Sequence, residues 1–386
     1  MYNGGSLMNY RLLISLPILL LALSARADLP FQVEEVTSFD EPWSLAFLPD
    51  GRMLVTEKKG SLLIVDQQGN KSPAVGGLPD VDYGGQGGLG DVIVHPEFDK
   101  NGLVYISYAE GGVDNTRGAA VARGVLETEG RRPQLKQVEV IWRQYPKMLG
   151  RGHYGHRLLI DTDGYLWITS GDRQKFTPAQ DMQTNIGKIL RLHDDGSVPA
   201  DNPFVNYRET DANVDKEAVY DQIWALGVRN PLGIAQAADG RIWESEMGPL
   251  HGDELNLVER GANYGYPVVS NGDHYDGRKM PNHETRPEFD APRVWWDQSI
   301  APADLIILRG KTFKAWQGDA LIPGLASAAI IRVELSADGS AQEVERYAMG
   351  QRIRSLEEGP DGAVWVLEDE RHDKGGRLLK LTPTGS

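Results

Sequence analysis

The hydrophobic positions of this chain fall into short stretches that alternate with polar turns. Five segments share one pattern, in which an apolar stretch, an Asp-Gly or Asn-Gly turn and a second stretch with aromatic or β-branched residues follow one another: SLAFLPDGRMLVTE, GDVIVHPEFDKNGLVYISY, RLLIDTDGYLWITSG, LGIAQAADGRIWESE and RSLEEGPDGAVWVLED. Glycine tolerates the positive φ that such tight turns require. Each segment is therefore predicted to form a β-hairpin.

These hairpins recur along the chain as units of similar size. A third strand-like stretch follows some of them, as in SLLIVDQQG, KILRLHDDG, AIIRVELSADG and RLLKLTPTG. The turn glycines are separated by 51, 62, 76 and 122 residues, in the order Gly51, Gly102, Gly164, Gly240 and Gly362. The last interval, about two periods, contains a degraded copy, GDALIPGLASAAIIRV. Six units predict an all-β fold, a six-bladed β-propeller in one domain over residues 28–386.

The early FQVEEV segment is predicted to complete the last blade and close the ring. The alternative architecture is a β-sandwich or a pair of smaller β domains. No linker-like stretch divides the chain, and residues 265–300, rich in Gly, Pro, Asn, Asp and His, are predicted to be one long inserted loop.

The first 27 residues have the pattern of a secretory signal peptide rather than of a folded element. Arg11 precedes an apolar run over residues 12–23, and Ala25-Arg26-Ala27 forms a small-x-small cleavage site before Asp28. An N-terminal membrane anchor is the alternative. After residue 27 no stretch reaches the apolar length of a membrane-spanning helix. The mature protein is expected to be periplasmic or secreted, without membrane insertion.

Net charge and composition exclude several classes of partner and of catalytic chemistry. Removal of the leader takes away two arginines, so the mature chain has 38 Lys and Arg against 55 Asp and Glu, a net charge of −17. This acidity argues against nucleic acid and anionic membranes as partners, and it favours a basic electron-transfer partner. The chain has no cysteine, which excludes thiol catalysis and thiolate metal ligands.

Polar residues stand at turns between the predicted strands, where a propeller would gather them around its axis. Gln86 lies in a glycine-rich turn that matches G-x-G-x-x-G, but a strand follows it, so a dinucleotide fold is rejected. His153 and His156 precede a strand and are candidates for a general base, with a hydrogen-bonded surface histidine as the alternative. Arg229-Asn230 offers donors for carboxylate or quinone oxygens, or a salt bridge with a turn.

Two further motifs complete the set. A Gly248-Pro249 turn followed by Asp253-Glu254 offers oxygen ligands for a hard cation such as Ca²⁺, although no EF-hand loop is present. Arg352 and Arg354 alternate on one strand and share a face, which favours an anionic partner, or solvated arginines.

Taken in order, these motifs resemble the soluble quinoprotein glucose dehydrogenase family, and within it the periplasmic aldose sugar dehydrogenases. The similarity covers about Pro42 to Leu381 and includes PWSLAFLPDGRMLVTE, GQGGLGDVIVHPEF, ALGVRNPLGIA and GDELNLVERGANYGYP. The resemblance implies a six-bladed propeller that binds pyrroloquinoline quinone (PQQ) and Ca²⁺ near its axis. It implies oxidation of the C1 hydroxyl of aldose sugars to lactones, with an external electron acceptor, by a monomer or homodimer.

The resemblance also implies roles for individual residues. His153 and Arg229 would be catalytic, with His153 as the general base, because the family histidine lies four residues before the arginine matched by Arg157. The residues that would hold the quinone are Gln86, His153, Arg229, Asn230, Arg352 and Arg354. The carbonyls of Gly248 and Pro249 would bind the catalytic calcium, and Asp253, Glu254 and Tyr264 match a second, structural calcium region.

At two positions the chain departs from the family pattern. A lysine that contacts the cofactor is replaced by Ala326, and an acid that precedes the histidine in some members is replaced by Gly152. Two other functions stay open on the sequence: a calcium-dependent propeller lactonase, which would hydrolyse lactones without quinone, and a binding propeller without catalysis.

Overall fold

The computed structural model describes most of the chain as one set of antiparallel sheets. The described parts are Met1, residues 29–205, Tyr207, residues 219–371 and residues 375–385. The expected leader falls outside them except for Met1. The described residues form six sheets, one with three strands and five with four. The prediction of a six-bladed β-propeller is confirmed, and we number the sheets as blades 1 to 6 along the chain.

Blades 1 to 5 are meanders of consecutive strands. Blade 1 contains β2 (Pro42–Phe47), β3 (Met53–Glu57) and β4 (Ser61–Val65). Blade 2 contains β5 (Leu89–Val94), β6 (Leu103–Gly111), β7 (Arg117–Glu127) and β8 (Gln134–Arg143). Blade 3 contains β9 (Gly155–Ile160), β10 (Tyr165–Ser170), β11 (Lys188–His193) and β12 (Ile223–Leu226). Blade 4 contains β13 (Pro231–Gln236), β14 (Ile242–Glu246), β15 (Asp253–Leu257) and β16 (Val294–Trp296). Blade 5 contains β17 (Ile306–Ile307), β18 (Ala320–Gly324), β19 (Ala329–Leu335) and β20 (Ala341–Ala348).

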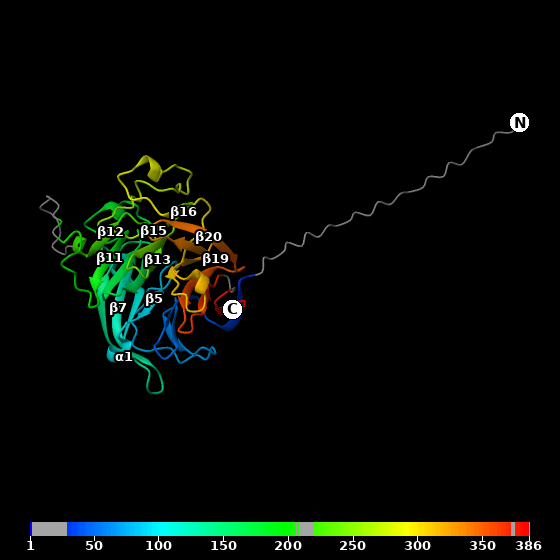
Figure 1. Cartoon of the computed structure of the whole chain (residues 1–386). Helices are drawn as coiled ribbons and strands as arrows, with labels where there is room; N and C mark the ends of the chain where they lie inside the picture. Colours follow the sequence, from blue (N-terminus) through cyan, green and yellow to red (C-terminus); the bar gives the residue numbers. More distant parts are fainter. Residues whose placement is uncertain (2–28, 206, 208–218, 372–374, 386) are drawn as a thin grey trace.

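Blade 6 joins the two ends of the described chain. It contains β21 (Ile353–Glu358), β22 (Val364–Glu368), β23 (Arg377–Pro383) and, as its outer strand, β1 (Phe31–Ser38). β1 pairs antiparallel with β23, from Phe31 opposite Pro383 to Ser38 opposite Arg377. The predicted closure by FQVEEV is therefore confirmed. The innermost strands contact one another in the order β2, β5, β9, β13, β17, β21 and back to β2, which closes the ring (Figure 1).

Helix is a minor component of the described residues. α1 (Phe98–Asn101) is a single turn that ends at Gly102, whose φ is 65°. The short 3₁₀ turns are η1 (Val113–Asn115), η2 (Thr177–Gln180), η3 (Tyr220–Gln222), η4 (His283–Thr285) and η5 (Lys314–Trp316). Helices of membrane-spanning length and apolarity are absent from the part of the chain described above.

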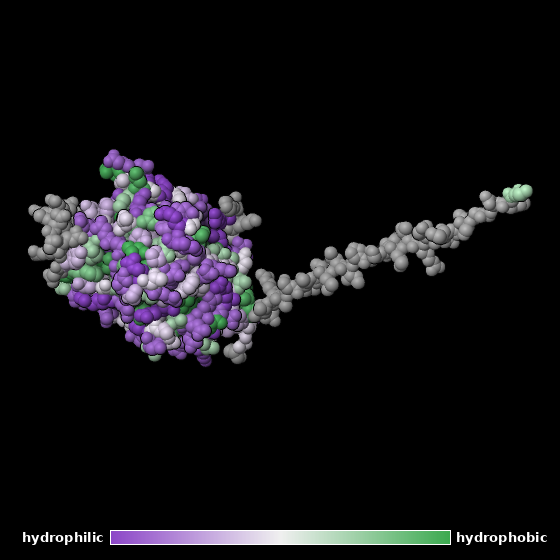
Figure 2. Space-filling view, turned by 90° about the horizontal axis from the view of Figure 1, so that it is seen from above, coloured by the Kyte–Doolittle hydropathy of each residue, from purple (hydrophilic) through white to green (hydrophobic). Residues whose placement is uncertain are grey.

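The core consists of six apolar layers, one between each pair of neighbouring blades. β22 shows how a strand serves two layers: Val364 and Val366 pack toward blade 5, whereas Trp365 and Leu367 pack toward blade 1. Successive side chains of a strand point to opposite faces, so a strand with both faces buried is an unbroken apolar run. On the outer face shown in Figure 2, hydrophilic residues predominate and apolar ones form small separate patches.

The guanidinium of Arg157 in β9 is buried between the blades. It contacts the inner strands of blades 1, 2, 4 and 6 and the segment just before β17 of blade 5. Its Nε donates to the carbonyl of Leu232 at 2.8 Å, Nη1 donates to Ser44 Oγ at 3.3 Å and to Asp91 Oδ1 at 3.1 Å, and Nη2 donates to Ala303 O at 2.7 Å and Arg354 O at 3.4 Å. Asp304 Oδ2 lies 3.3 Å from Nη2. We call Arg157, Asp91, Asp304 and Ser44 the axial cluster.

Two expectations about irregular segments need correction. Residues 265–300 are not a single loop, because β16 lies inside them and pairs with β15, Asp253 opposite Trp296, as the outer strand of blade 4. The rest of the segment, with η4, projects from one end of the molecule (Figure 1). The expected turn at Gly102 is a helical turn, because residues 98–101 wind once before β6 begins.

Candidate active site

A buried polar contact joins His153 to Asp172. His153 Nδ1 and Asp172 Oδ1 are 2.6 Å apart, and both side chains are buried. His153 stands just before β9, and Asp172 follows the end of β10 in the same blade. Burial lowers the pKa of His153, Asp172 raises it and Arg229 lowers it further, with a net decrease. A neutral imidazole with Nδ1–H donated to a carboxylate has a free lone pair at Nε2.

The glycine-rich turn of blade 2 packs against this histidine. Gln86 Oε1 accepts a hydrogen bond from the backbone N–H of His153 at 2.7 Å, so the glutamine holds the backbone of the histidine. Nearby glycines permit close contact: a Cβ at Gly87 would lie 2.8 Å from the ring of Tyr154, and one at Gly90 would overlap His156. The glycines therefore allow rings to approach the turn.

The replacement of an acid by Gly152 has a structural explanation. A Cβ at residue 152 would lie 2.4 Å from the side chain of Gln174, so this space is filled. The backbone N–H of Gln174 donates to Asp172 Oδ1 at 2.9 Å. In this chain the carboxylate in contact with His153 is that of Asp172.

The second histidine of the motif has a packing role. His156 stacks on Trp43, with ring centroids 5.0 Å apart, and its Nδ1 lies 2.7 Å from Ser107 Oγ. Complete burial lowers its pKa to about 3, with smaller contributions from Arg157 and Arg173. His156 is therefore a core residue in blade 3.

Arg229 and Asn230 follow the end of β12 and face the same centre. Arg229 Nη1 donates to Met247 O at 2.9 Å and to Gly248 O at 2.5 Å, and its carbonyl accepts from Asp172 N at 2.7 Å. Three buried polar atoms here have no hydrogen-bond partner among the described residues: Arg229 Nε, Asn230 Oδ1 and Asp172 Oδ2. Three orphaned polar atoms in one place indicate a site that a polar ligand completes.

Blade 6 contributes a pair of arginines that share one carboxylate. Arg352 Nε donates to Asp369 Oδ2 at 2.7 Å, and Arg354 Nε donates to Asp369 Oδ1 at 2.9 Å. The anionic partner suggested by the sequence is thus supplied within the fold. Arg352 Nη1 also donates to Leu325 O at 3.2 Å, beside the exposed Ala326. Position 326 therefore borders the arginine pair. A lysine at this position, as in the family pattern, would lie beside the two arginines.

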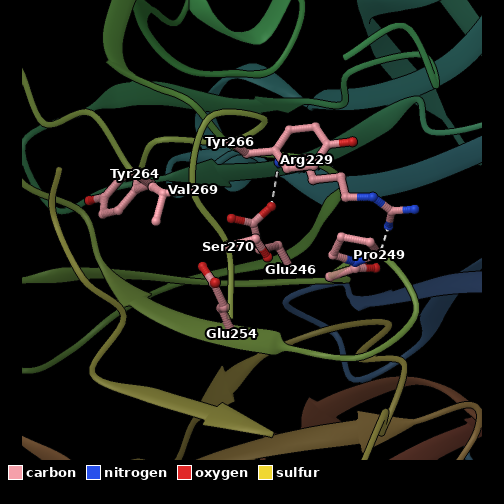
Figure 3. A pocket seen from close by; sticks show the side chains of 9 residues that line it. Arg229, Glu246, Pro249, Glu254, Tyr264, Tyr266, Val269 and Ser270 are labelled. Carbon is pink, nitrogen blue, oxygen red and sulfur yellow. Dashed lines mark hydrogen bonds between the residues drawn. The ribbon is translucent and has the colours of Figure 1, made fainter. Parts of the chain in front are cut away.

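The Gly248-Pro249 turn lines a small cavity of about 10 Å³ with Glu246, Glu254 and Tyr264 (Figure 3). This is roughly the space of one water molecule. The sequence predicted one calcium at the turn and a second at Asp253, Glu254 and Tyr264; the structure brings the turn, Glu254 and Tyr264 to one cavity. Asp253 points elsewhere, accepting from Gly248 N at 2.9 Å and Ala301 N at 2.7 Å.

The wall of this cavity continues into a group of buried acids that we call the carboxylate cluster: Glu244, Glu246, Glu254 and the amide Asn256. They are cross-strand pairs of β14 and β15, with Glu244 opposite Asn256 and Glu246 opposite Glu254. Glu246 Oε2 accepts from the N–H groups of Arg229 and Asn230. Burial raises the pKa of Glu246 to about 8, and burial with mutual repulsion raises those of Glu244 and Glu254.

Like charges directly opposite one another destabilise a sheet unless a cation lies between them. Glu244 Oε2 and Asn256 Oδ1 are buried without partners. Carboxylate, carbonyl and amide oxygens are the ligands of Ca²⁺. The donor set therefore fits calcium, although among the described side chains no three His, Asp or Glu residues are already arranged as a metal site.

Sequence reasoning missed Asp172 and Glu244, and it noted Glu246 beside the Gly248-Pro249 turn without assigning it to the site. Glu244 and Glu246 carried a signal, since IWESE places two acids at i and i+2 of a predicted strand and hence on one buried face. Asp172 carried a weaker one, as the acid after the strand that ends in Ser170. Its contact with His153 arises only when the two loops of blade 3 meet.

Comparison with known proteins agrees with this geometry. The family model described as glucose / sorbosone dehydrogenase matches residues 39–380. An aldose sugar dehydrogenase of Escherichia coli is 36% identical over 351 residues, which cover 89% of this chain and 90% of that protein. Quinoprotein glucose dehydrogenase B of Acinetobacter calcoaceticus is 25% identical over 463 residues, with 94% of each chain covered. The crystal structure of the soluble aldose sugar dehydrogenase of E. coli in its apo-form superposes with a TM-score of 0.83 at 34% identity, covering 92% of this chain and all of that one. This chain therefore belongs to the glucose/sorbosone dehydrogenase family.

Proposed function

We propose that this protein is a PQQ- and Ca²⁺-dependent dehydrogenase that oxidises the C1 hydroxyl of aldose sugars to the lactone. Two named relatives support the proposal, an aldose sugar dehydrogenase and a quinoprotein glucose dehydrogenase. The observation that carries it is the buried His153–Asp172 pair beside the unpaired donor of Arg229.

The residues present fit the two proposed cofactors. PQQ carries three carboxylates and quinone oxygens, for which Arg229, Arg352 and Arg354 supply donors and Asn230 supplies an amide. The carbonyls of Gly248 and Pro249 and the carboxylate cluster supply oxygen ligands for calcium. When bound, PQQ would supply the electrophilic carbon that accepts hydride, and calcium would increase its electrophilicity as a Lewis acid.

The chain itself supplies the proton chemistry. Asp172 accepts the Nδ1 proton of His153 and so directs the lone pair of Nε2 toward the substrate. The pKa of Asp172 is lowered, because the contacts with His153 outweigh burial, so the carboxylate stays ionised. The lowered pKa of His153 keeps the imidazole neutral at neutral pH. His153 Nε2 takes the proton of the C1 hydroxyl as the C1 hydride leaves, a general-base step worth about 10²–10⁴-fold in rate.

The test is reconstitution of the purified protein with PQQ and Ca²⁺ and measurement of aldose-dependent dye reduction. Turnover with at least one aldose, together with quinone absorbance on the protein, is expected. Absence of both with every aldose contradicts the proposal, and lactone hydrolysis without quinone supports the lactonase alternative instead.

A variant tests the proposed base. His153→Ala is expected still to bind PQQ and to lose about 10²–10⁴-fold in kcat. The wild-type rate should fall as pH decreases through the lowered pKa of His153, because protonated imidazole cannot accept the hydroxyl proton. Retained turnover in His153→Ala would reject His153 as the base.

We also propose export to the periplasm or the exterior, on the basis of the leader pattern over residues 1–27. The mature protein is expected to begin at Asp28, and mass spectrometry of the protein purified from its native host measures this. An uncleaved N-terminus contradicts it.

A further inference from the structure

Blade 1 is absent from the set of site residues predicted from the sequence. The other contributions are Gln86 from blade 2, His153 from blade 3, Arg229 and Asn230 from blade 4, and Arg352 and Arg354 from blade 6. Blade 5 holds Ala326, where the family pattern has a lysine. The structure brings one further cation to this centre, and it comes from blade 1.

That cation is Lys58, the first residue after β3. Its backbone is fixed on both sides: its N–H donates to Glu41 O at 2.9 Å, and its carbonyl accepts from Leu89 N at 2.9 Å. A Cβ at Gly88 would lie 2.3 Å from the Lys58 carbonyl, so the glycine-rich turn needs Gly88 in order to pack here. Lys58 is thus built into the turn that carries Gln86.

The ammonium group lies against the turn that carries Gln86. Lys58 Nζ donates to Gly85 O at 3.2 Å and lies 5.8 Å from the centre of the Tyr83 ring. The side chain is partly buried, which lowers its pKa; Glu41 raises the pKa, Arg354 lowers it and Asp369 raises it. Glu41, which accepts the hydrogen bond of the Lys58 N–H, donates its own N–H to Glu370 Oε2 at 2.8 Å, so this part of blade 1 packs against the blade 6 loop that contains Asp369.

The net positive charge of the arginine pair and its carboxylate is small, so a further cation can be accommodated beside them. Arg352 and Arg354 share Asp369, so the three residues together carry a net charge of +1. A ligand with several carboxylates is bound better by one more cation. Lys58 uses one N–H in its contact with Gly85, and an ammonium has three.

We propose that Lys58 binds a carboxylate of the quinone cofactor and replaces, from blade 1, the lysine that is absent at position 326. This inference rests on the proposed function. Lys58 acts as a binding residue, so its removal weakens cofactor affinity without removing the base.

The experiment is a titration of the calcium-loaded apoprotein with PQQ, followed by quinone absorbance and by quenching of protein fluorescence. Lys58→Met is expected to raise the Kd of PQQ roughly ten- to a hundredfold, the effect of one charged hydrogen bond. Lys59→Met is the matched control, because Lys59 is exposed and pairs with Asp40 at 2.8 Å; its Kd should equal that of the wild type. Lys58→Gln, which keeps a donor for Gly85, should also lose affinity and serves if Lys58→Met does not fold.

Rescue gives a second readout. Ala326 is exposed, so Lys58→Gln combined with Ala326→Lys should recover part of the lost affinity. Wild-type Kd values in folded Lys58→Met and Lys58→Gln overturn this inference and leave the proposed function intact. Failure of the wild type to bind PQQ overturns the proposed function itself.

Discussion

The axial cluster and the carboxylate cluster are equally buried, yet they differ in how their charges are balanced. In the axial cluster the guanidinium of Arg157 lies between Asp91 and Asp304, and no polar side-chain atom of these residues is left without a partner. In the carboxylate cluster Glu246 faces Glu254 across two strands, and Glu244 Oε2 has no partner. The first group is complete in the folded chain, whereas in the second burial and mutual repulsion raise the pKa values of the acids, and we propose that a cation completes it.

The difference shows two uses of buried charge in one ring. Breaking a buried ion pair is strongly destabilising, because the remaining charge has no compensation. Arg157 therefore links its own strand to the other five blades. The carboxylate cluster contains acids with raised pKa values and borders the Gly248-Pro249 turn and Arg229, so its stability is expected to depend on pH and on added cations.

The largest expected effect comes from breaking the complete cluster. Arg157→Met should lower the free energy of unfolding by about 3–5 kcal/mol, because Asp91 and Asp304 are left buried without their cation. Denaturant unfolding measures this. Arg346→Met is the control: Arg346 pairs with Glu343 at the surface at 2.8 Å, with 38% of its side chain exposed, and it should cost less than about 1 kcal/mol. Equal effects of the two variants would contradict the role given to Arg157.

The six-bladed ring could be predicted from the sequence, but only some residues of the two clusters could. Asp-Gly turns and alternation are local signals, so hairpins, the number of blades and closure by FQVEEV followed from the chain alone. The role of Arg157 could not be predicted, since its contacts come from four other inner strands and from the segment before β17, all far apart in sequence. β16 was missed because Val294–Trp296 is short and follows a long irregular segment.

The same limit applies to the site. The polar turns pointed to a common centre because every blade places its loops there. The Asp172–His153 contact, the Asp369 bridge and the place of Lys58 depend on how neighbouring loops pack, and no periodicity encodes that.

A smaller effect is expected when the incomplete cluster receives its cation. Calcium at about 100 times its Kd should stabilise the wild-type protein by about 2.7 kcal/mol. Glu254→Gln should lose most of this gain, and its calcium-free form should be more stable than the calcium-free wild type, because the folded state no longer contains a buried carboxyl group whose pKa is raised by burial and by Glu246. Thermal unfolding with calcium and with chelator measures both.

The control for this pair of measurements is Glu139→Gln. Glu139 is 61% exposed and pairs with Arg123 at 3.3 Å, so its removal should leave the calcium response unchanged. A full calcium response in Glu254→Gln would show that the cation does not bind to the carboxylate cluster.

The last expected effect concerns pH in the calcium-free protein. The pKa of Glu246 is raised from 4.5 to about 8 in the folded state. Between these values the folded state holds a proton that the unfolded state has released, so this contribution is complete below pH 4.5 and is lost as pH rises to about 8. As pH rises over this range, the free energy of unfolding of the wild type should therefore fall relative to that of Glu246→Gln, by at most about 1.4 kcal/mol per pH unit.

Urea unfolding of both proteins between about pH 5 and 8, with chelator present, measures this difference. Saturating calcium should remove it, because a bound cation keeps the carboxylate ionised in the folded state. The axial cluster offers the contrast: its carboxylates already face a guanidinium, so calcium should not alter its contribution. If the two proteins had the same pH dependence without calcium, Glu246 would already be compensated, and the distinction between the complete and the incomplete cluster would fail.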